Sequence, residues 1–472
     1  WSAMPPKEND KLTADQLAVL KRWIDLGAPW PDAKTQARYI AEERAKPVTA
    51  EGVLVKTSGG TSEDWTYRRY RPEDVWAFQP VVKPKVPQGA ANPVDAFINR
   101  KLKATGFARA PQADFRTLVK RAYYDLTGLP PTPFEIFQFR QAWDKDPVQA
   151  WATLIDRLLA SPHYGERWGQ HWLDVARYAD TGGYSNDYER SNMWRYRDYV
   201  IRAFNEDKPY DEFIREQIAG DELADASLRR RISDWNQFQN ARQNGKLYNA
   251  RESEQLVASS FLRMGPWDPA MVKKPQARQI YLDDVVNAVG ETFLSTTMRC
   301  FKCHDHKFDP LPTRDYYRMY AVFEPTQLAE RPAPFFEKEN RVGFKEGEAA
   351  TRHLLSFATD KHNALYNKQE NAARVWYTKA GTKYLDEKAR QKLPDDEKPP
   401  RHVGLSPEEQ GRKKVRRQDE WIWQRRLERY QPMAQSVYNG PVPNFLNARK
   451  LRMNARANNK WRPDSRILGG GA

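Results

Sequence analysis

Cysteine and histidine are scarce in this chain, and long apolar runs are missing from it. Its 472 residues include two cysteines and seven histidines. Both cysteines belong to one short motif, so neither is left for a structural disulfide. No apolar run approaches the roughly 18 residues that a membrane span requires, and the mean hydropathy is -0.87. These absences exclude a disulfide-stapled scaffold and a membrane-spanning helix, and the length favours a soluble protein of two or three domains.

Basic residues outnumber acidic ones. The 77 Lys and Arg residues against 62 Asp and Glu residues give a formal net charge of +15. Such a balance favours acidic partners, so we expect an acidic redox protein or an anionic polysaccharide. Nucleic acid is not expected, because no motif typical of nucleic-acid binding is present. A basic helix expected near residues 408–430 is either a solvated face or a docking surface; its cations are Lys413, Lys414, Arg416, Arg417, Arg425 and Arg426.

The two cysteines lie in the run Cys300-Phe301-Lys302-Cys303-His304. This C-x-x-C-H pattern is the attachment signature of c-type haem. Two thiols one helical turn apart can add to the two vinyl groups at one edge of the porphyrin, and the imidazole that follows becomes the proximal iron ligand. The motif therefore predicts one covalent haem c, attached at Cys300 and Cys303 and ligated by His304.

Three other interpretations of the motif are weaker. A thioredoxin-like site needs a βαβ context, whereas residues 283–297 before the motif predict a helix. A zinc site made of both cysteines, His304 and His306 would crowd four ligands into seven residues. A disulfide across the motif would close a strained loop and leave His304 unexplained.

The motif also predicts where the protein works. Haem c is attached after export, on thiols kept reduced until then, so we expect a periplasmic or extracellular protein. No signal peptide is visible at Trp1, which predicts a mature or cut fragment.

The motif does not define the sixth iron ligand. Candidates are His171, which flanks an apolar stripe on a predicted helix, His163 and Met264. His306 is too close to His304 to reach the opposite face of the same haem. We expect His306 to bond a haem propionate or a backbone carbonyl instead.

Apolar periodicity predicts a mainly α-helical fold with long irregular connections and the haem at a helix-to-loop junction. A first helix is expected over 13–26, opened by a capping box of Thr13 and Gln16. In the loop after the motif, Asp305, Lys307 and Asp309 are expected to fix the conformation.

Two groups of charged residues have more than one interpretation. Asp283 and Asp284 predict the acidic N-terminus of a helix. A second group either orients a substrate beside the haem or forms a buried ion-pair network between helices. Its members are Arg177, Asp180, Tyr184, Asp187, Arg190, Arg195 and Asp198.

Four longer blocks resemble a known family. They are Leu118–Ile136, Leu158–Tyr184, Trp194–Leu223 and Met298–Phe323, and the first and last read "LVKRAYYDLTGLPPTPFEI" and "MRCFKCHDHKFDPLPTRDYYRMYAVF". From about residue 92 to 330 the chain resembles the planctomycete cytochrome c domain proteins, which are large and haem-bearing. The resemblance implies haem and export, and it names no substrate.

The resemblance also implies an order of domains. Residues 1–31 resemble the end of an upstream cytochrome c domain, and 32–91 are expected to be a linker. Residues 92–330 form the haem-bearing helical domain, and 331–472 a charged helical extension and bridge to a further C-terminal domain. Met4 is then expected to ligate a haem anchored on another polypeptide segment, with the first helix packed against that segment.

Three functions are compatible with these features. The preferred one is electron transfer between the haem of this chain and another cytochrome domain or redox protein. The second is a haem enzyme, peroxidase-like or oxidising a small substrate, with an open or weak sixth position. The third is a surface or polysaccharide-binding protein with an accessory haem. The sequence leaves open whether the protein is an enzyme.

Overall fold

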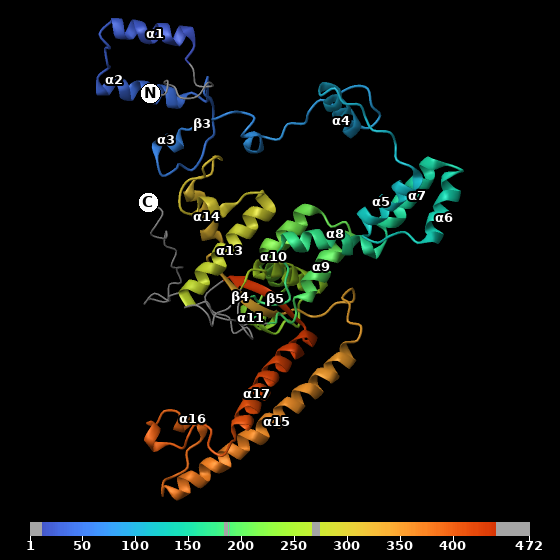
Figure 1. The fold of residues 1–472 in the computed structure, drawn as a ribbon, viewed down its shortest axis with the longest axis vertical. Helices are drawn as coiled ribbons and strands as arrows, with labels where there is room; N and C mark the ends of the chain where they lie inside the picture. The colour runs from blue at the N-terminus through green and yellow to red at the C-terminus, as the bar shows by residue number, and fades with distance from the viewer. Residues whose placement is uncertain (1–11, 184–186, 188, 267–273, 440–472) are drawn as a thin grey trace. The chain divides into compact units, whose positions relative to one another are not determined.

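A computed structural model describes residues 12–183, 187, 189–266 and 274–439 of the protein (Figure 1). Helix dominates these residues, which confirms the prediction of a mainly α-helical fold. They form two compact units: residues 12–86 with 300–316, and residues 87–299 with 317–439. Within the described ranges, no helix combines the length and the apolar character needed to cross a membrane.

The first unit opens with the helix that the sequence predicts. α1 spans Ala14–Asp25, with Thr13 as its N-cap and a capping box closed by Gln16. Gly27 follows with φ of 82°, a left-handed conformation that glycine adopts without strain. The prediction of a helix over 13–26 is therefore confirmed.

The segment expected as a linker contains a 13-residue helix and several shorter elements. They are α2 (Ala33–Ala45), β1 (Val48–Thr49), β2 (Gly52–Leu54), α3 (Glu63–Thr66), β3 (Arg69–Tyr70) and the 3-10 turn η2 (Trp76–Phe78). The strands form an antiparallel sheet in the order β1-β2-β3. Strands of two or three residues are too short for periodicity to reveal, whereas the 13-residue helix α2 was not predicted from the sequence. The domain limits stay a prediction.

The second unit begins with α4 (Pro93–Ala104), α5 (Phe115–Leu126), α6 (Pro133–Trp143), α7 (Pro147–Leu159) and α8 (Pro162–Val175). The last three each start with proline directly after a capping side chain: Thr132, Asp146 and Ser161. Proline suits the first helical position, where its missing N–H would have no partner in any case. A shared apolar core that includes Phe139 and Leu154 holds α5, α6 and α7 together.

The centre of this unit is a buried two-stranded ribbon. β4 (Thr326–Pro332) pairs antiparallel with β5 (Met433–Asn439). The helical elements between α8 and β4 are α9 (Trp194–Asn205), α10 (Tyr210–Arg231), α11 (Trp235–Asn244), α12 (Ala250–Ala258), η3 (Ser259–Arg263), α13 (Lys274–Leu294), η4 (Met298–Phe301) and α14 (Thr313–Phe323). Elements α10, α11, α12 and η3 contact the ribbon. Because α13 begins at Lys274, Asp283 and Asp284 lie inside it, and the prediction that they form its N-terminus is wrong.

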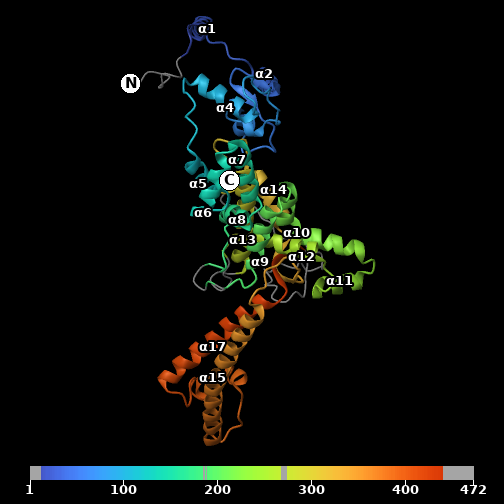
Figure 2. The same cartoon turned by 90° about the vertical axis from the view of Figure 1, so that its right-hand side faces the viewer.

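A long helical hairpin is inserted in the chain between the two ribbon strands, and its two arms run side by side in Figure 2. Its arms are α15 (Phe344–Lys379) and α17 (Pro407–Leu427), joined through α16 (Glu387–Arg390) and η5 (Asp395–Glu397) and followed by η6 (Glu428–Tyr430). α17 and η6 confirm the helix expected near 408–430. Covered residues recur at alternating spacings of four and three along both arms, as in a coiled coil.

Polar side chains occupy part of the seam between the arms. His362 Nδ1 lies 3.3 Å from a carboxylate oxygen of Glu420, and Lys413 donates a hydrogen bond of 2.5 Å to the side-chain oxygen of Gln369. The hairpin is therefore held by two polar layers in addition to its apolar contacts.

Candidate haem-attachment site

The C-x-x-C-H motif lies at a helix-to-loop junction. η4 begins at Met298 and ends at Phe301, and the chain then continues without helix until α14 begins at Thr313. Phe301 is buried, whereas Cys300, Cys303 and His304 are exposed. The motif thus offers two thiols and an imidazole to solvent, with its aromatic residue turned inward.

The two thiols are free in the structure, without a disulfide between them. Within the described ranges, no group of three or more His, Cys, Asp or Glu residues is arranged to hold a metal ion.

The hydrogen bond of the His304 ring fixes its tautomer. Nδ1 lies 2.8 Å from the backbone carbonyl oxygen of Asp305. A carbonyl only accepts, so Nδ1 carries the proton and donates it, and Nε2 keeps its lone pair. A histidine that binds a metal through one nitrogen is commonly oriented in this way by a hydrogen bond from the other. The imidazole is thus prepared to bind a metal through Nε2.

Asp305 anchors the loop that follows the motif. Its Oδ2 accepts hydrogen bonds from the backbone N–H and the hydroxyl of Thr61, at 2.7 and 2.8 Å. Its Oδ1 accepts from the backbone N–H of Thr313, at 2.9 Å. The side chain is buried, and a buried carboxylate requires such partners. Asp305 therefore ties the motif loop both to the N-terminal segment and to the start of α14.

The same N-terminal segment holds further backbone of the loop. Trp65 Nε1 donates to the carbonyl oxygen of His306 at 3.0 Å, and Arg68 donates to that of Lys307 at 2.5 Å. Arg314 donates to the carbonyl oxygen of Ser58 at 2.8 Å. We call residues 58–68 the strap, because they bind the loop after the motif at several points.

His306 is turned toward the loop itself. Its Nδ1 accepts hydrogen bonds from the backbone N–H groups of Asp309, at 2.9 Å, and Phe308, at 3.4 Å. Nδ1 also lies 3.2 Å from a carboxylate oxygen of Asp309. Because His306 Nδ1 accepts these two bonds, it carries no proton that it could donate to the Asp309 carboxylate. We therefore attribute the short distance between the two groups to the turn of the chain from 306 to 309. In this structure the partners of His306 Nδ1 are backbone amides, where the sequence led us to expect a backbone carbonyl or a haem propionate.

Tyr70 has a buried hydroxyl group with no hydrogen-bond partner among the described residues. Burial raises the pKa of Tyr70, Arg68 opposes this, and the carboxylates of Asp309 and Asp305 in the motif loop add to it. An unpaired buried hydroxyl is costly unless another group satisfies it. The Tyr70 hydroxyl is therefore an unused donor of the first unit.

The sequence matches one family model, named PSCyt2 and described as a protein of unknown function (DUF1549), over residues 93–328. This match covers half of the chain. The chain belongs to the PSCyt2 family. No curated protein and no solved structure matched it. The resemblance noted over residues 92–330 is confirmed at the level of the family, whose description assigns no function.

The candidate distal ligands of this PSCyt2 chain lie in its second unit. His171 is exposed on α8, and its ring meets that of Trp168 edge-on at 5.6 Å between centroids. His163 is in the first turn of the same helix, where Nδ1 lies 2.7 Å from Glu166. Met264 is buried directly after η3. The sixth iron ligand stays a prediction.

Met4 lies outside the described residues, so its expected role as a haem ligand also stays a prediction. The helix that follows it presents apolar residues to solvent. Leu17, Leu20 and Ile24 of α1 are exposed, and the described residues supply no apolar cover for them.

The charged group around residues 177–198 is divided among several partners. Arg177 donates to Asp284 at 2.5 Å, and Arg190 donates to the backbone carbonyls of Met264 and Gly265. Arg195 is fully buried against Glu339. The other members bind within their own neighbourhood: Tyr178 donates to Asp180, Asp187 accepts from the N–H of Gly183, Asp198 pairs with Arg197, and Tyr184 lies outside the described residues. These contacts favour the structural interpretation of the group.

Most cations of α17 also have internal partners. Lys413 binds Gln369, and Arg416 pairs with Asp419. Arg425 pairs with Glu330 and Glu428, and Arg426 with Glu189. Lys414 and Arg417 are exposed. The basic helix therefore uses much of its charge on partners within its own unit, which weakens its interpretation as a docking surface.

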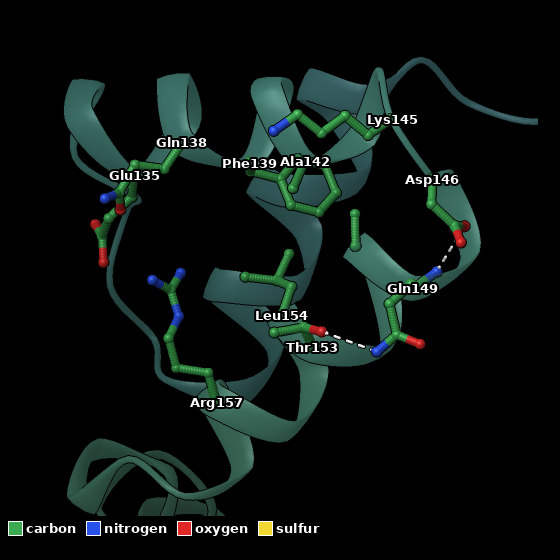
Figure 3. Close-up of a pocket in the computed structure, with 11 residues that line it drawn as sticks. Glu135, Gln138, Phe139, Ala142, Lys145, Asp146, Gln149, Thr153, Leu154 and Arg157 are labelled. Atoms are coloured by element: carbon green, nitrogen blue, oxygen red, sulfur yellow. Dashed lines mark hydrogen bonds between the residues drawn. The ribbon is translucent and has the colours of Figure 1, made fainter.

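A cavity of about 360 Å³ lies between α6 and α7 (Figure 3). Phe139 and Leu154 give it an apolar floor, and Arg157 projects into it. Arg157 donates to the Tyr123 hydroxyl at 2.6 Å. Its lining contains neither histidine nor cysteine, and Lys145 and Arg157 are balanced by Glu135 and Asp146. The cavity therefore supplies no haem ligand and no excess charge.

Sequence reasoning found the motif and named Asp305 as a residue that fixes the loop, but it missed the strap. Ser58, Gly60, Thr61 and Trp65 are ordinary residue types for an irregular segment. The double glycine Gly59-Gly60 was the one available signal, and on its own it indicates only a turn.

Proposed function

We propose that this chain carries one covalent haem c and transfers electrons through it outside the cytoplasm. The observation that supports this best is the state of His304 inside a C-x-x-C-H motif. Its Nδ1–H is engaged by the Asp305 carbonyl at 2.8 Å, which leaves Nε2 for a metal. The exposed, unpaired thiols of Cys300 and Cys303 suit the same group.

Several residues of the chain would hold the haem, each through a different contact. Cys300 and Cys303 would each form a thioether bond by adding the S–H across a vinyl group, and His304 Nε2 would bind the iron. Tyr70, whose buried hydroxyl has no partner among the described residues, would donate a hydrogen bond to a haem carboxylate. When bound, the haem supplies one-electron chemistry. The protein's part is to orient the imidazole, anchor the loop and limit access of water.

A haem-staining experiment tests the proposal. The full chain is produced in a bacterial periplasm that contains a cytochrome c maturation system, and covalent haem is detected after denaturing electrophoresis. We expect staining in the unmodified protein, weakened or lost staining in Cys303→Ser, and loss in the double variant Cys300→Ser/Cys303→Ser. His353→Ala serves as control because that exposed histidine of α15 lies outside the motif and is not a candidate iron ligand. An unstained parent protein would refute the proposal.

The absorption spectrum then separates electron transfer from haem enzymology. A six-coordinate low-spin iron supports electron transfer, because no position is open to a substrate. A five-coordinate or high-spin iron that binds carbon monoxide or peroxide would replace electron transfer with the enzyme interpretation.

A further inference from the structure

We propose that the strap is a positioning element for His304 and that Thr61 sets the orientation of its imidazole by acting through Asp305. This inference rests on the proposed haem attachment. The contacts form a continuous path: Thr61 binds the Asp305 carboxylate twice, and the Asp305 carbonyl accepts the proton of His304 Nδ1. Asp305 thus bonds the strap through its side chain and bonds His304, the proposed iron ligand, through its backbone carbonyl.

Gly60 shows how closely the strap approaches the loop. A Cβ atom at this position would lie 2.5 Å from the ring of Trp65 and 2.6 Å from Asp305 Oδ2. Both distances are shorter than van der Waals contact, so only glycine allows Thr61 to reach Asp305 without a shift of the loop. The hydroxyl of Thr66 accepts from the Gly60 N–H at 2.9 Å and keeps this turn in place.

The strap also limits the freedom of the loop as a whole. Trp65 and Arg68 bind the carbonyl oxygens of His306 and Lys307, the second and third residues after His304. Both carboxylate oxygens of Asp305 are engaged: Oδ2 accepts from Thr61 and Oδ1 accepts from Thr313. A ligand loop held at successive residues presents its imidazole in one orientation, which is what a site with a defined reduction potential requires.

The strap lies outside the part of the chain that matches the family model. The match begins at residue 93, whereas the strap ends at residue 68. The motif loop is inside the match and takes its support from a segment that precedes it. The residues that would bind the haem therefore lie in the family region, and the strap that positions them lies in the N-terminal segment.

Two matched substitutions in the full haem-carrying chain test this role. Thr61→Val keeps the shape of the side chain and removes the hydroxyl bond to Asp305, whereas Thr61→Ser keeps the hydroxyl. We expect Thr61→Val to retain covalent haem, with altered electron paramagnetic resonance g-values and a shifted midpoint potential. Thr61→Ser should restore both. Thr105→Val, which removes an exposed hydroxyl bonded within its own helix, is the control and should leave both unchanged.

Hydrogen exchange provides a second readout that does not depend on iron. Amides of residues 304–312 should exchange faster in Thr61→Val than in the parent chain. If Thr61→Val does not fold, Trp65→Phe replaces it, since it keeps an aromatic ring and removes the N–H that binds the His306 carbonyl. Parent protein with covalent haem, together with g-values and potential unchanged in both variants, would overturn the positioning role. Absence of haem from the parent would instead refute the proposed function.

Discussion

Arg195 and Glu339 form a bidentate ion pair from which solvent is excluded. Arg195 Nε and Nη2 lie 2.6 and 3.0 Å from the two carboxylate oxygens, and both side chains are 0% exposed. Arg195 Nη1 also donates to the carbonyl oxygens of Ala333 and Met433, at 2.9 and 3.0 Å. This single guanidinium therefore connects α9 to the end of β4 and the beginning of β5.

Removing one partner of this pair should destabilise the second unit. Glu339→Gln leaves the Arg195 charge buried without its counter-ion, so we expect the free energy of unfolding to fall by about 3–5 kcal/mol. Glu348→Gln is the control, because its ion pair with Arg352 is exposed and should contribute less than about 1 kcal/mol. Urea unfolding monitored by tryptophan fluorescence measures both. Equal losses in the two variants would contradict this account.

Asp221 should make stability depend on pH. Burial, the largest cause, raises its pKa from 3.8 to about 7, with the Arg331 charge opposing. The folded state then binds the proton more tightly than the unfolded state. The contribution of the Asp221 proton to the free energy of unfolding is thus fully present below pH 4 and is lost as the pH rises through about 7. Its size is on the order of 4 kcal/mol.

Asp221→Asn should remove this dependence. We expect the variant to lose less stability than the parent chain between pH 5 and pH 8, because the amide has no proton to release. Urea unfolding at both pH values gives the comparison. Parallel pH profiles for the two proteins would show that Asp221 does not titrate as described.

His171→Ala tests the predicted distal ligand. If His171 binds the iron of the haem at His304, its removal converts a six-coordinate low-spin spectrum into a high-spin or exogenously ligated one. His353→Ala, which removes an exposed histidine of α15 that is not a candidate ligand, should leave the spectrum unchanged. An identical spectrum for His171→Ala would exclude it as ligand and direct attention to His163 and Met264.

Tyr70→Phe should have opposite effects with and without haem. In the haem-free variant Cys300→Ser/Cys303→Ser, removing an unpaired buried hydroxyl should raise the free energy of unfolding by about 1 kcal/mol. In the haem-carrying chain, where we propose that the hydroxyl binds a haem carboxylate, the same substitution should lower it. The same sign in both backgrounds would show that Tyr70 does not contact the haem.

The sequence was sufficient to predict features that depend on residues close together in the chain. The capping box at Thr13 and the motif at Cys300 each depend on residues a few positions apart. The start of α13 was misplaced because two acidic residues resemble a helix N-terminus wherever they occur. A local pattern is therefore a reliable guide to an element and a weaker guide to its limits.

The long-range contacts that hold the candidate site and the fold in place could not be predicted in the same way. Thr61 and Asp305 are 244 residues apart, and Arg195 and Glu339 are 144 apart. A single sequence carries no signal that such residues meet, since threonine, arginine and acids are common on any surface. The Asp305–Thr61 contact became visible only when the fold brought the segments together.

The polar seam of the hairpin has a consequence for the position of its far end. The pairs His362–Glu420 and Gln369–Lys413 hold α15 and α17 in one register. Sliding one helix past the other by a heptad would separate both pairs, and in one direction it would place Lys413 opposite His362. These two pairs therefore favour one register of the hairpin over its neighbours, and with the register the position of residues 380–406 at its far end.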